Sequence, residues 1–237
     1  MKGRDESYSF LEHLEELRRR IIYILIIISI SSLGAYKFYP KILKFINLPL
    51  KKYQPQPVFT NPVEPFLNIF KLSIFTGALV SLPLILYQIW IFVSPAFTER
   101  ERRVFKWIFI LFPIFFYIGI SFGFFIFVPL TLKILFSFGK GMQPFISIGY
   151  YLNFIFLFSF SLGILFNLPV LIGGLSSAGI IDADFLISKR KFSVVGAFIL
   201  SAVLTPTTDI LTQIFLAIPI LILYEISILF AKILKSK

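Results

Sequence analysis

The chain has 237 residues, of which 57% are hydrophobic and only 15% are charged, and this balance predicts an integral membrane protein rather than a water-soluble domain. The net charge of +11 does not indicate nucleic-acid binding, because the basic residues form short clusters between apolar runs, which is typical of membrane topology. The sequence has no cysteine, which excludes disulfides, thiol catalysis and cysteine metal sites.

Residues 9–20 predict a short amphipathic helix that leads directly into a membrane span. Apolar side chains recur on one face at helical spacing, and acids and arginines occupy the other face. Ser9 followed by Glu12 fits a capping box and predicts that the helix starts at this point. Glu16 stands four residues before Arg20, which is the favoured order for an attractive pair on a helix.

Six apolar runs predict an all-α integral membrane protein with six transmembrane helices in a single membrane domain. The last two runs have 13 residues (192–204) and 15 residues (210–224, before Glu225), whereas about 20 are needed to cross about 30 Å of hydrocarbon. They therefore predict a shallow hairpin or a locally thinned bilayer. We find no internal repeat that would support an inverted-repeat transporter. The predicted spans are about 21–36, 72–93, 107–128, 150–172, 192–204 and 210–230.

Prolines, glycines and charges mark the connections between these runs. After the first span, Lys41 and Lys44 with their apolar neighbours predict a short surface helix. Residues 129–149 contain several helix breakers and predict an irregular connection. The fourth span is predicted to be interrupted at Asn167 and Pro169, because proline lacks the backbone donor of a regular helix.

The arginines predict the orientation of the chain in the membrane. All of them lie on the side that holds the N-terminus, the second and fourth connections and the C-terminal tail. By the positive-inside rule this side faces the cytoplasm, so both termini are expected there. The eight residues are Arg4, Arg18, Arg19, Arg20, Arg100, Arg102, Arg103 and Arg190.

Residues that would support catalysis are scarce. His13 is the only histidine, and without a second histidine or a cysteine its glutamate neighbours make a poor metal site. A single histidine in an amphipathic helix is more often an interfacial residue. No nucleophile with a matching base and no Gly-rich phosphate loop are evident, so we expect neither an enzyme nor a bound cofactor.

Carboxylates at the predicted cytoplasmic surface form a first candidate site. Glu15 and Glu16 precede the first span, and Glu99 and Glu101 follow the second. If these two spans are neighbours, the acids form a negative patch within an otherwise basic surface. Such a patch suits a guanidinium partner, because a carboxylate accepts both parallel donors of an arginine. The alternative is that Glu99 and Glu101 only neutralise the adjacent arginines.

Polar residues in the last three spans form a second candidate set. Asn167, Gln213 and Glu225 lie in or near the fourth and sixth spans, and Asp209 precedes the sixth. Such groups are costly at membrane depth and tend to face a protein interior or a wet cavity. An alternative function is therefore a proton- or ion-coupled small-solute transporter with Glu225, Asp209 and Gln213 as a relay. A purely structural role is also open, with an interhelical hydrogen bond at Asn167.

Several segments taken together resemble the TatC family, the multispanning subunit of the twin-arginine protein translocase. The resemblance covers nearly the whole chain, and its specificity comes from the ordered set of segments in a chain of this length. The segments are 13–20, 60–66, 86–90, 92–96, 101–103, 204–206, 217–219 and 223–226, with Asp209 and Gln213.

The resemblance implies a receptor that binds the paired arginines of signal peptides on folded cargo proteins and exports this cargo across the cytoplasmic membrane of a prokaryote. It also implies a concave, cup-like bundle of helices. Export of the cargo is implied to be driven by the proton gradient. The implied partners are small single-span subunits of the TatA and TatB type, the lipid bilayer and further copies of the chain in a receptor complex.

The resemblance assigns roles to individual positions of this sequence. Glu16 and Glu101 match the signal-binding acids. The positions that shape or support their site are Arg18, Pro49, Phe92 and Pro95, and those associated with translocation or partner contact are Asn167, Asp209, Gln213 and Glu225.

Two features depart from the family pattern. The family commonly has a glutamate where this chain has Asn167, and an amide can neither carry a charge nor take up a proton. The turn at 205–209 is one residue longer than the common version, so Asp209 is expected to be displaced.

Overall fold

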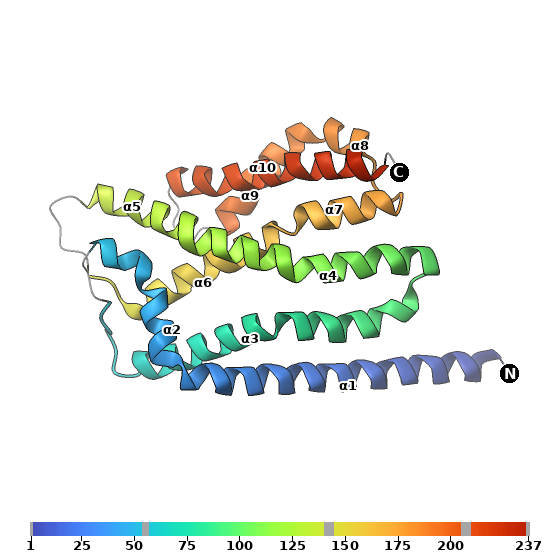
Figure 1. The fold of residues 1–237 in the computed structure, drawn as a ribbon, viewed down its shortest axis with the longest axis horizontal. Coiled ribbons are helices and arrows are strands. Elements are labelled where there is room, and N and C mark those ends of the chain that lie inside the picture. Colours follow the sequence, from blue (N-terminus) through green and yellow to red (C-terminus); the bar gives the residue numbers. More distant parts are fainter. Residues whose placement is uncertain (1, 54–56, 140–144, 205–209, 236–237) are drawn as a thin grey trace.

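The computed structural model describes residues 2–53, 57–139, 145–204 and 210–235, and Figure 1 shows a bundle built almost entirely of helices. Within these ranges an isolated bridge joins Val58 and Ser147. The predicted all-α fold is confirmed. The elements are α1 (Lys2–Lys37), α2 (Tyr39–Ile46), η1 (Leu48–Tyr53), α3 (Glu64–Val93), η2 (Ser94–Ala96), α4 (Glu99–Phe122), η3 (Gly123–Phe127), α5 (Val128–Phe138), α6 (Ile148–Leu165), α7 (Leu168–Ser177), α8 (Ala183–Ser188), α9 (Arg190–Leu204) and α10 (Ile210–Lys235).

Five helical stretches in the described residues are long and apolar enough to cross a membrane: α1, α3 with η2, α4 through α5, α6 with α7, and α10. α9 has 15 residues and is short, as its apolar run predicts. α10 has 26 residues and is longer than the apolar run that ends before Glu225. The helix passes Glu225 without a break, since glutamate is a good helix former, and this half-exposed carboxylate pairs with Arg190.

The first two helices differ in how well the sequence predicts them. α1 is one continuous helix that begins at Lys2, so the capping box predicted at Ser9 is wrong. The sequence signal fails there because helix-compatible residues extend the helix toward the N-terminus. α2 confirms the short helix predicted around Lys41 and Lys44, and its start carries a proline, which suits a first helical turn.

The helix that begins with α4 continues where an irregular connection is predicted. α4 is followed without a gap by η3, a π-turn, and then by α5, so the prediction for 129–138 is wrong. The N–H of Val128 bonds to the carbonyl of Gly123, one residue further back than in an α-helix. This wider turn accommodates Pro129, which has no N–H and would interrupt a regular helical ladder.

The predicted interruption of the fourth span is confirmed between α6 and α7. Asn167 precedes α7, and Pro169 lies in the first turn of that helix, where a missing N–H costs little. Asn167 is fully buried, and its Nδ2 donates to the carbonyl oxygen of Gly163 at 2.9 Å. Because Gly163 belongs to the last turn of α6, this bond satisfies a backbone carbonyl at the end of α6. The amide of Asn167 therefore helps to end that helix.

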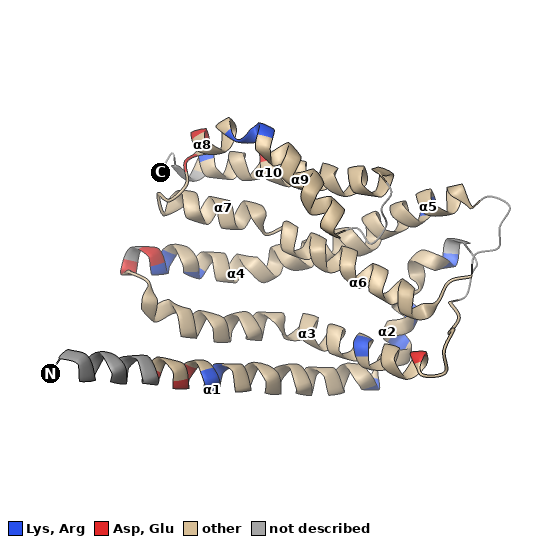
Figure 2. Cartoon of the chain, turned by 180° about the vertical axis from the view of Figure 1, so that it is seen from behind, with Lys and Arg blue, Asp and Glu red and all other residues tan. Residues whose placement is uncertain are grey.

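The helices follow one another across the bundle. α1 packs on α3, α3 on α4, α4 on α6 and α7, and α7 on α10, which also contacts α9. Buried apolar side chains of α3, α6 and α10, among them Leu72, Phe158 and Leu216, belong to one core. Both described chain ends and the α3–α4 turn lie at the same end of the bundle (Figure 1). Charged residues gather toward the two ends of the bundle (Figure 2).

The contact between α1 and α3 depends on Gly77. A Cβ atom at this position would lie 2.6 Å from the backbone nitrogen of Ser32 and 2.7 Å from its Cα, so α1 would have to move. We expect Gly77→Ala to lower the free energy of unfolding in detergent by about 1–3 kcal/mol. Gly34→Ala on α1 is the matched control, because a Cβ there meets nothing within 4 Å. Equal stabilities of the two variants would contradict the close approach of these helices.

Candidate functional site

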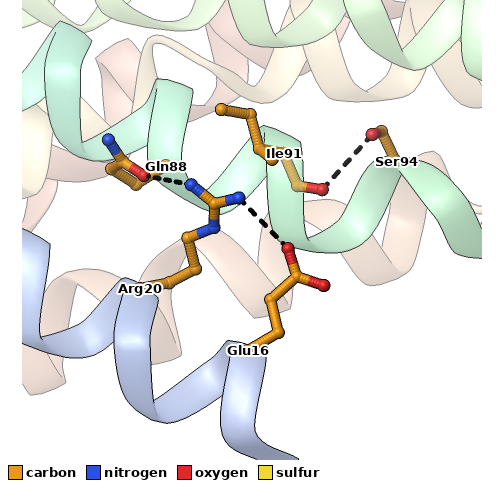
Figure 3. Close-up of polar contacts among 5 residues, drawn as sticks. All are labelled: Glu16, Arg20, Gln88, Ile91 and Ser94. Atoms are coloured by element: carbon orange, nitrogen blue, oxygen red, sulfur yellow. Dashed lines mark hydrogen bonds and ion pairs between the residues drawn. The ribbon is translucent and has the colours of Figure 1, made fainter. Parts of the chain in front are cut away.

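Glu16, Arg20 and Gln88 form a polar contact between α1 and α3 (Figure 3). Arg20 Nη2 lies 3.1 Å from Glu16 Oε1, which confirms the predicted pair, and Arg20 Nη1 donates to Gln88 Oε1 at 2.9 Å. The side chain of Arg20 is only 18% exposed, so the guanidinium is held at the helix contact. Among the described residues, Glu16 Oε2 has no hydrogen-bond partner. One carboxylate oxygen is thus held and the other is available.

His13 packs on Phe92, which belongs to the last turn of α3. The two rings are stacked, with their centroids 4.5 Å apart and their planes inclined by 18°. Stacked rings of this kind add about 0.5–1.5 kcal/mol beyond their buried area. The sequence predicts His13 only as an interfacial residue, and no local signal pairs it with Phe92. The contact fixes α1 against the end of α3 one helical turn before Glu16.

The turn between α3 and α4 carries the second acid. Thr98 caps α4, and its hydroxyl and N–H donate to Glu101 Oε2 at 2.7 and 3.0 Å. Thr98 Oγ1 accepts the N–H of Glu101 at 3.5 Å, which completes a capping box. Pro95 lies just before this cap, in η2. Glu101 Oε1 has no hydrogen-bond partner in the described part of the chain.

Aromatic side chains hold the same turn. Phe97 stacks on Phe105 with ring centroids 4.2 Å apart, and Trp90 contacts Phe109 at 5.1 Å. Trp90 also lies over Phe97 at 6.4 Å. These contacts join the end of α3 to the start of α4, so Glu101 stands on a packed turn rather than on a free loop.

The capping contacts also act on the ionisation of Glu101, which lies in the charged turns of α4 before the apolar run begins at Trp107. The hydrogen bonds from the hydroxyl and the N–H of Thr98 lower the pKa of Glu101 below its ordinary value of 4.5. A lowered pKa keeps the carboxylate ionised at lower pH. Its attraction for a cation is therefore present at neutral pH and is lost only as the pH falls through the lowered pKa.

Removing the Thr98 hydroxyl should shift the loss of the negative charge of Glu101 to higher pH. In Thr98→Ala the carboxylate of Glu101 loses one of its two donors, so its pKa should rise toward the ordinary value. We expect the pH of half-maximal binding of an arginine-containing peptide to be higher in Thr98→Ala than in the wild type. Titration of peptide binding from about pH 3 to pH 6 measures this shift. Identical titration curves would show that Thr98 does not control the charge of Glu101.

The structure brings most of the predicted binding residues to one end of the bundle. α1, with Glu16 and the exposed Arg18, and α4, with Glu101, lie on either side of the end of α3, which carries Phe92. Pro49 is not brought to this surface, because it is buried in η1 at the opposite end of the bundle. The residues that sequence reasoning missed are Gln88, Thr98 and His13, which position the acids and the end of α3.

The second candidate set is spread along the bundle. Gln213 Nε2 donates to the carbonyl oxygen of Phe198 at 2.9 Å and so links α10 to α9. Glu225 Oε2 lies 2.6 Å from Arg190 Nη2, and both side chains are half exposed. Gln213 and Glu225 are 12 residues apart on α10, which corresponds to about 18 Å along a helix. This spacing is too long for direct proton transfer between the two side chains.

Two further predictions concern this set and metal binding. Asp209 and the 205–209 turn lie outside the described residues. Among the residues that are described, no group of three or more histidine, aspartate and glutamate side chains is placed to hold a metal ion.

Comparison with known proteins gives a consistent result. Residues 12–219 match the family described as Sec-independent protein translocase protein (TatC). The TatC of Carboxydothermus hydrogenoformans is 38% identical over 98% of this chain and 96% of its own length, and that of Escherichia coli K12 is 32% identical over 98% and 92%. A crystal structure of the twin-arginine translocase receptor TatC superposes with a TM-score of 0.79 at 35% identity, covering 94% of this chain and 99% of that one.

Proposed function

Since this chain belongs to the TatC family of Sec-independent protein translocase proteins, we propose that it is the subunit that binds twin-arginine signal peptides and forms the core scaffold of the translocase. A component of a protein translocase moves a protein rather than converting a substrate, so the chain is not an enzyme. The remaining question is which residues bind the signal.

One observation carries the proposal for the binding residues. Glu16 and Glu101 each have one carboxylate oxygen held by a neighbouring side chain, whereas the other oxygen has no partner among the described residues. A carboxylate fixed in this way loses little conformational freedom when a guanidinium binds. The two acids stand at the same end of the bundle on α1 and α4, so each can receive one arginine of the pair.

The surroundings of the acids support the same assignment. The stacked rings of His13 and Phe92 provide an apolar surface on the end of α3, which lies between the two acidic helices. Guanidinium groups stack on aromatic faces and form parallel bonds to carboxylates, whereas an ammonium group forms only single bonds. The site should therefore distinguish arginine from lysine.

The rest of the proposal concerns the complete translocase. The end that carries the arginines faces the cytoplasm of a prokaryotic cell, and the apolar part of the signal slides along the lipid-facing surface of the helices. Folded cargo then crosses the cytoplasmic membrane with the help of small single-span Tat subunits, further copies of this chain and the proton gradient. Asn167, Asp209, Gln213 and Glu225 are the positions that we assign to translocation or partner contact.

Binding of signal peptides to the purified chain in lipid nanodiscs tests the proposal. A labelled peptide with two arginines is compared with a peptide in which both are lysine, since the two have the same charge. We expect the twin-arginine peptide to bind at least about tenfold more tightly, because only arginine offers the parallel donors. Equal affinities would contradict specific recognition of the arginine pair.

A further inference from the structure

A polar pocket lies at the end of the bundle opposite to the two acids. Glu64, Asn68 and Lys71 recur at the spacing of one helix face in the first turns of α3. Together with Gly149 and Asn153 of α6 they line a pocket of about 360 Å³. This volume falls within the range of about 300–1,000 Å³ that is typical of sites for small ligands.

Glu64 builds the wall of this pocket and is not free to bind a ligand. Its Oε2 accepts the N–H of Thr60 at 2.6 Å and the hydroxyl of Thr60 at 2.9 Å. Its Oε1 accepts the hydroxyl of Ser147 and the N–H of Gly149, the latter at 2.8 Å. Backbone bonds between Val58 and the 146–148 segment close the same region. The carboxylate therefore fixes the two sides of the pocket to each other.

Side chains that line the pocket carry donors without an acceptor among the described residues. Asn68 is only 2% exposed, and its Nδ2 has no hydrogen-bond partner among the described residues. Lys71 is exposed, and no ion pair joins its ammonium group to a described acid. Asn153 adds an exposed amide on the facing helix. A buried donor without an acceptor is costly, so this arrangement suits a ligand with several acceptor oxygens and a negative charge.

The surroundings of the pocket indicate where such a ligand comes from. Leu67 and Phe70 are about half exposed on α3, at 49% and 51%, and the ring of Tyr150 is 80% exposed at the start of α6. Exposed tyrosine is typical of the membrane–water interface. Exposed apolar side chains on the neighbouring helix suit contact with acyl chains. A ligand with a phosphate at the pocket and apolar chains along α3 would satisfy both surfaces.

We propose that this pocket binds the phosphodiester headgroup of a phospholipid in the leaflet at this end of the bundle. Asn68 Nδ2, the Lys71 ammonium and the Asn153 amide supply the donors, and Leu67 and Phe70 contact the acyl chains. The pocket offers one cation, Lys71, and the Glu64 carboxylate is already satisfied by its own donors. The pocket therefore recognises the phosphate that phospholipids share, rather than additional negative charge on the headgroup. The site is independent of the signal-binding acids.

Native mass spectrometry of the full chain in detergent tests the proposal. Phosphatidylglycerol, phosphatidylethanolamine and diacylglycerol with the same acyl chains are compared, and glycerol 3-phosphate serves as a soluble phosphate. We expect both phospholipids to bind with similar affinity. Diacylglycerol and glycerol 3-phosphate should each bind at least about tenfold more weakly than the phospholipids. Strong binding of diacylglycerol would mean that only the apolar surface matters, and strong binding of glycerol 3-phosphate would mean a soluble ligand; either result overturns the proposal.

Variants then locate the bound lipid. Lys71→Gln and Asn68→Leu are each expected to weaken phospholipid binding about tenfold. Lys44→Gln is the matched control, since Lys44 is also exposed on α2 but does not line the pocket, and it should bind as the wild type does. If Asn68→Leu does not fold, the exposed Lys71 decides the question. Phospholipid binding that is unchanged in Lys71→Gln would overturn the proposal.

Discussion

Replacing Glu101 with glutamine is expected to weaken the binding of a twin-arginine signal peptide by about tenfold to a hundredfold, because a charge-assisted bond to arginine is lost. Glutamine can still accept the N–H and hydroxyl of Thr98, since either glutamate or glutamine completes a capping box. The free energy of unfolding should therefore change by less than about 0.5 kcal/mol. Peptide binding in nanodiscs and thermal unfolding in detergent measure the two quantities.

Thr98→Ala is the matched control for this prediction. It removes the side chain that caps α4 and keeps the carboxylate of Glu101, so it should lower the free energy of unfolding by about 1 kcal/mol. Peptide affinity at neutral pH should remain close to that of the wild type. If Glu101→Gln binds normally, or if both variants lose affinity and stability together, Glu101 has only a capping role.

The Glu16→Ala variant is expected to lose both peptide affinity and stability. Arg20 is 82% buried at the contact of α1 with α3, and without Glu16 its guanidinium keeps Gln88 as its only described side-chain partner. A charge that loses its counter-ion at a largely buried site costs about 1–3 kcal/mol of stability. Peptide affinity should fall by about tenfold or more because one of the two acids is absent.

The double variant Glu16→Ala, Arg20→Met separates these two effects. Methionine fills part of the space of Arg20 without a charge, so the free energy of unfolding should return toward that of the wild type. Peptide affinity should stay low, because the acceptor for the signal arginine is still missing. Recovery of peptide binding together with stability would mean that Glu16 only supports α1.

The fold could be predicted where a signal is local in the sequence. The apolar runs, the break at Asn167 and Pro169, and the pair of Glu16 with Arg20 all depend on neighbours within one or two helical turns. The capping box predicted at Ser9 is wrong because helix-compatible residues precede this motif, whereas the equivalent motif at Thr98 follows a real interruption of the helix. The sequence does not predict the continuation of the helix past Pro129, because this continuation depends on a π-turn, which is rare in proteins.

The candidate site could be predicted only in part. The acids are recognisable from charge and from the family resemblance, but their supports come from distant positions. Arg20 and Gln88 are separated by 68 residues, and the stacking of His13 on Phe92 joins two different helices. A single sequence does not contain such pairings. For Pro49 the prediction fails in the other direction. The family resemblance associates this residue with the binding site, but the fold places it at the opposite end of the bundle.

A double-mutant cycle for peptide binding shows whether Glu16 and Glu101 each bind one arginine of the signal peptide. Glu16→Gln and Glu101→Gln are each combined with signal peptides in which one arginine of the pair is replaced by glutamine. If the acids bind the arginines directly, each acid should couple with one particular arginine by about 1.5 kcal/mol or more. Binding energies that add without coupling, to within about 0.5 kcal/mol for every combination, would contradict direct binding of the arginines by these two acids.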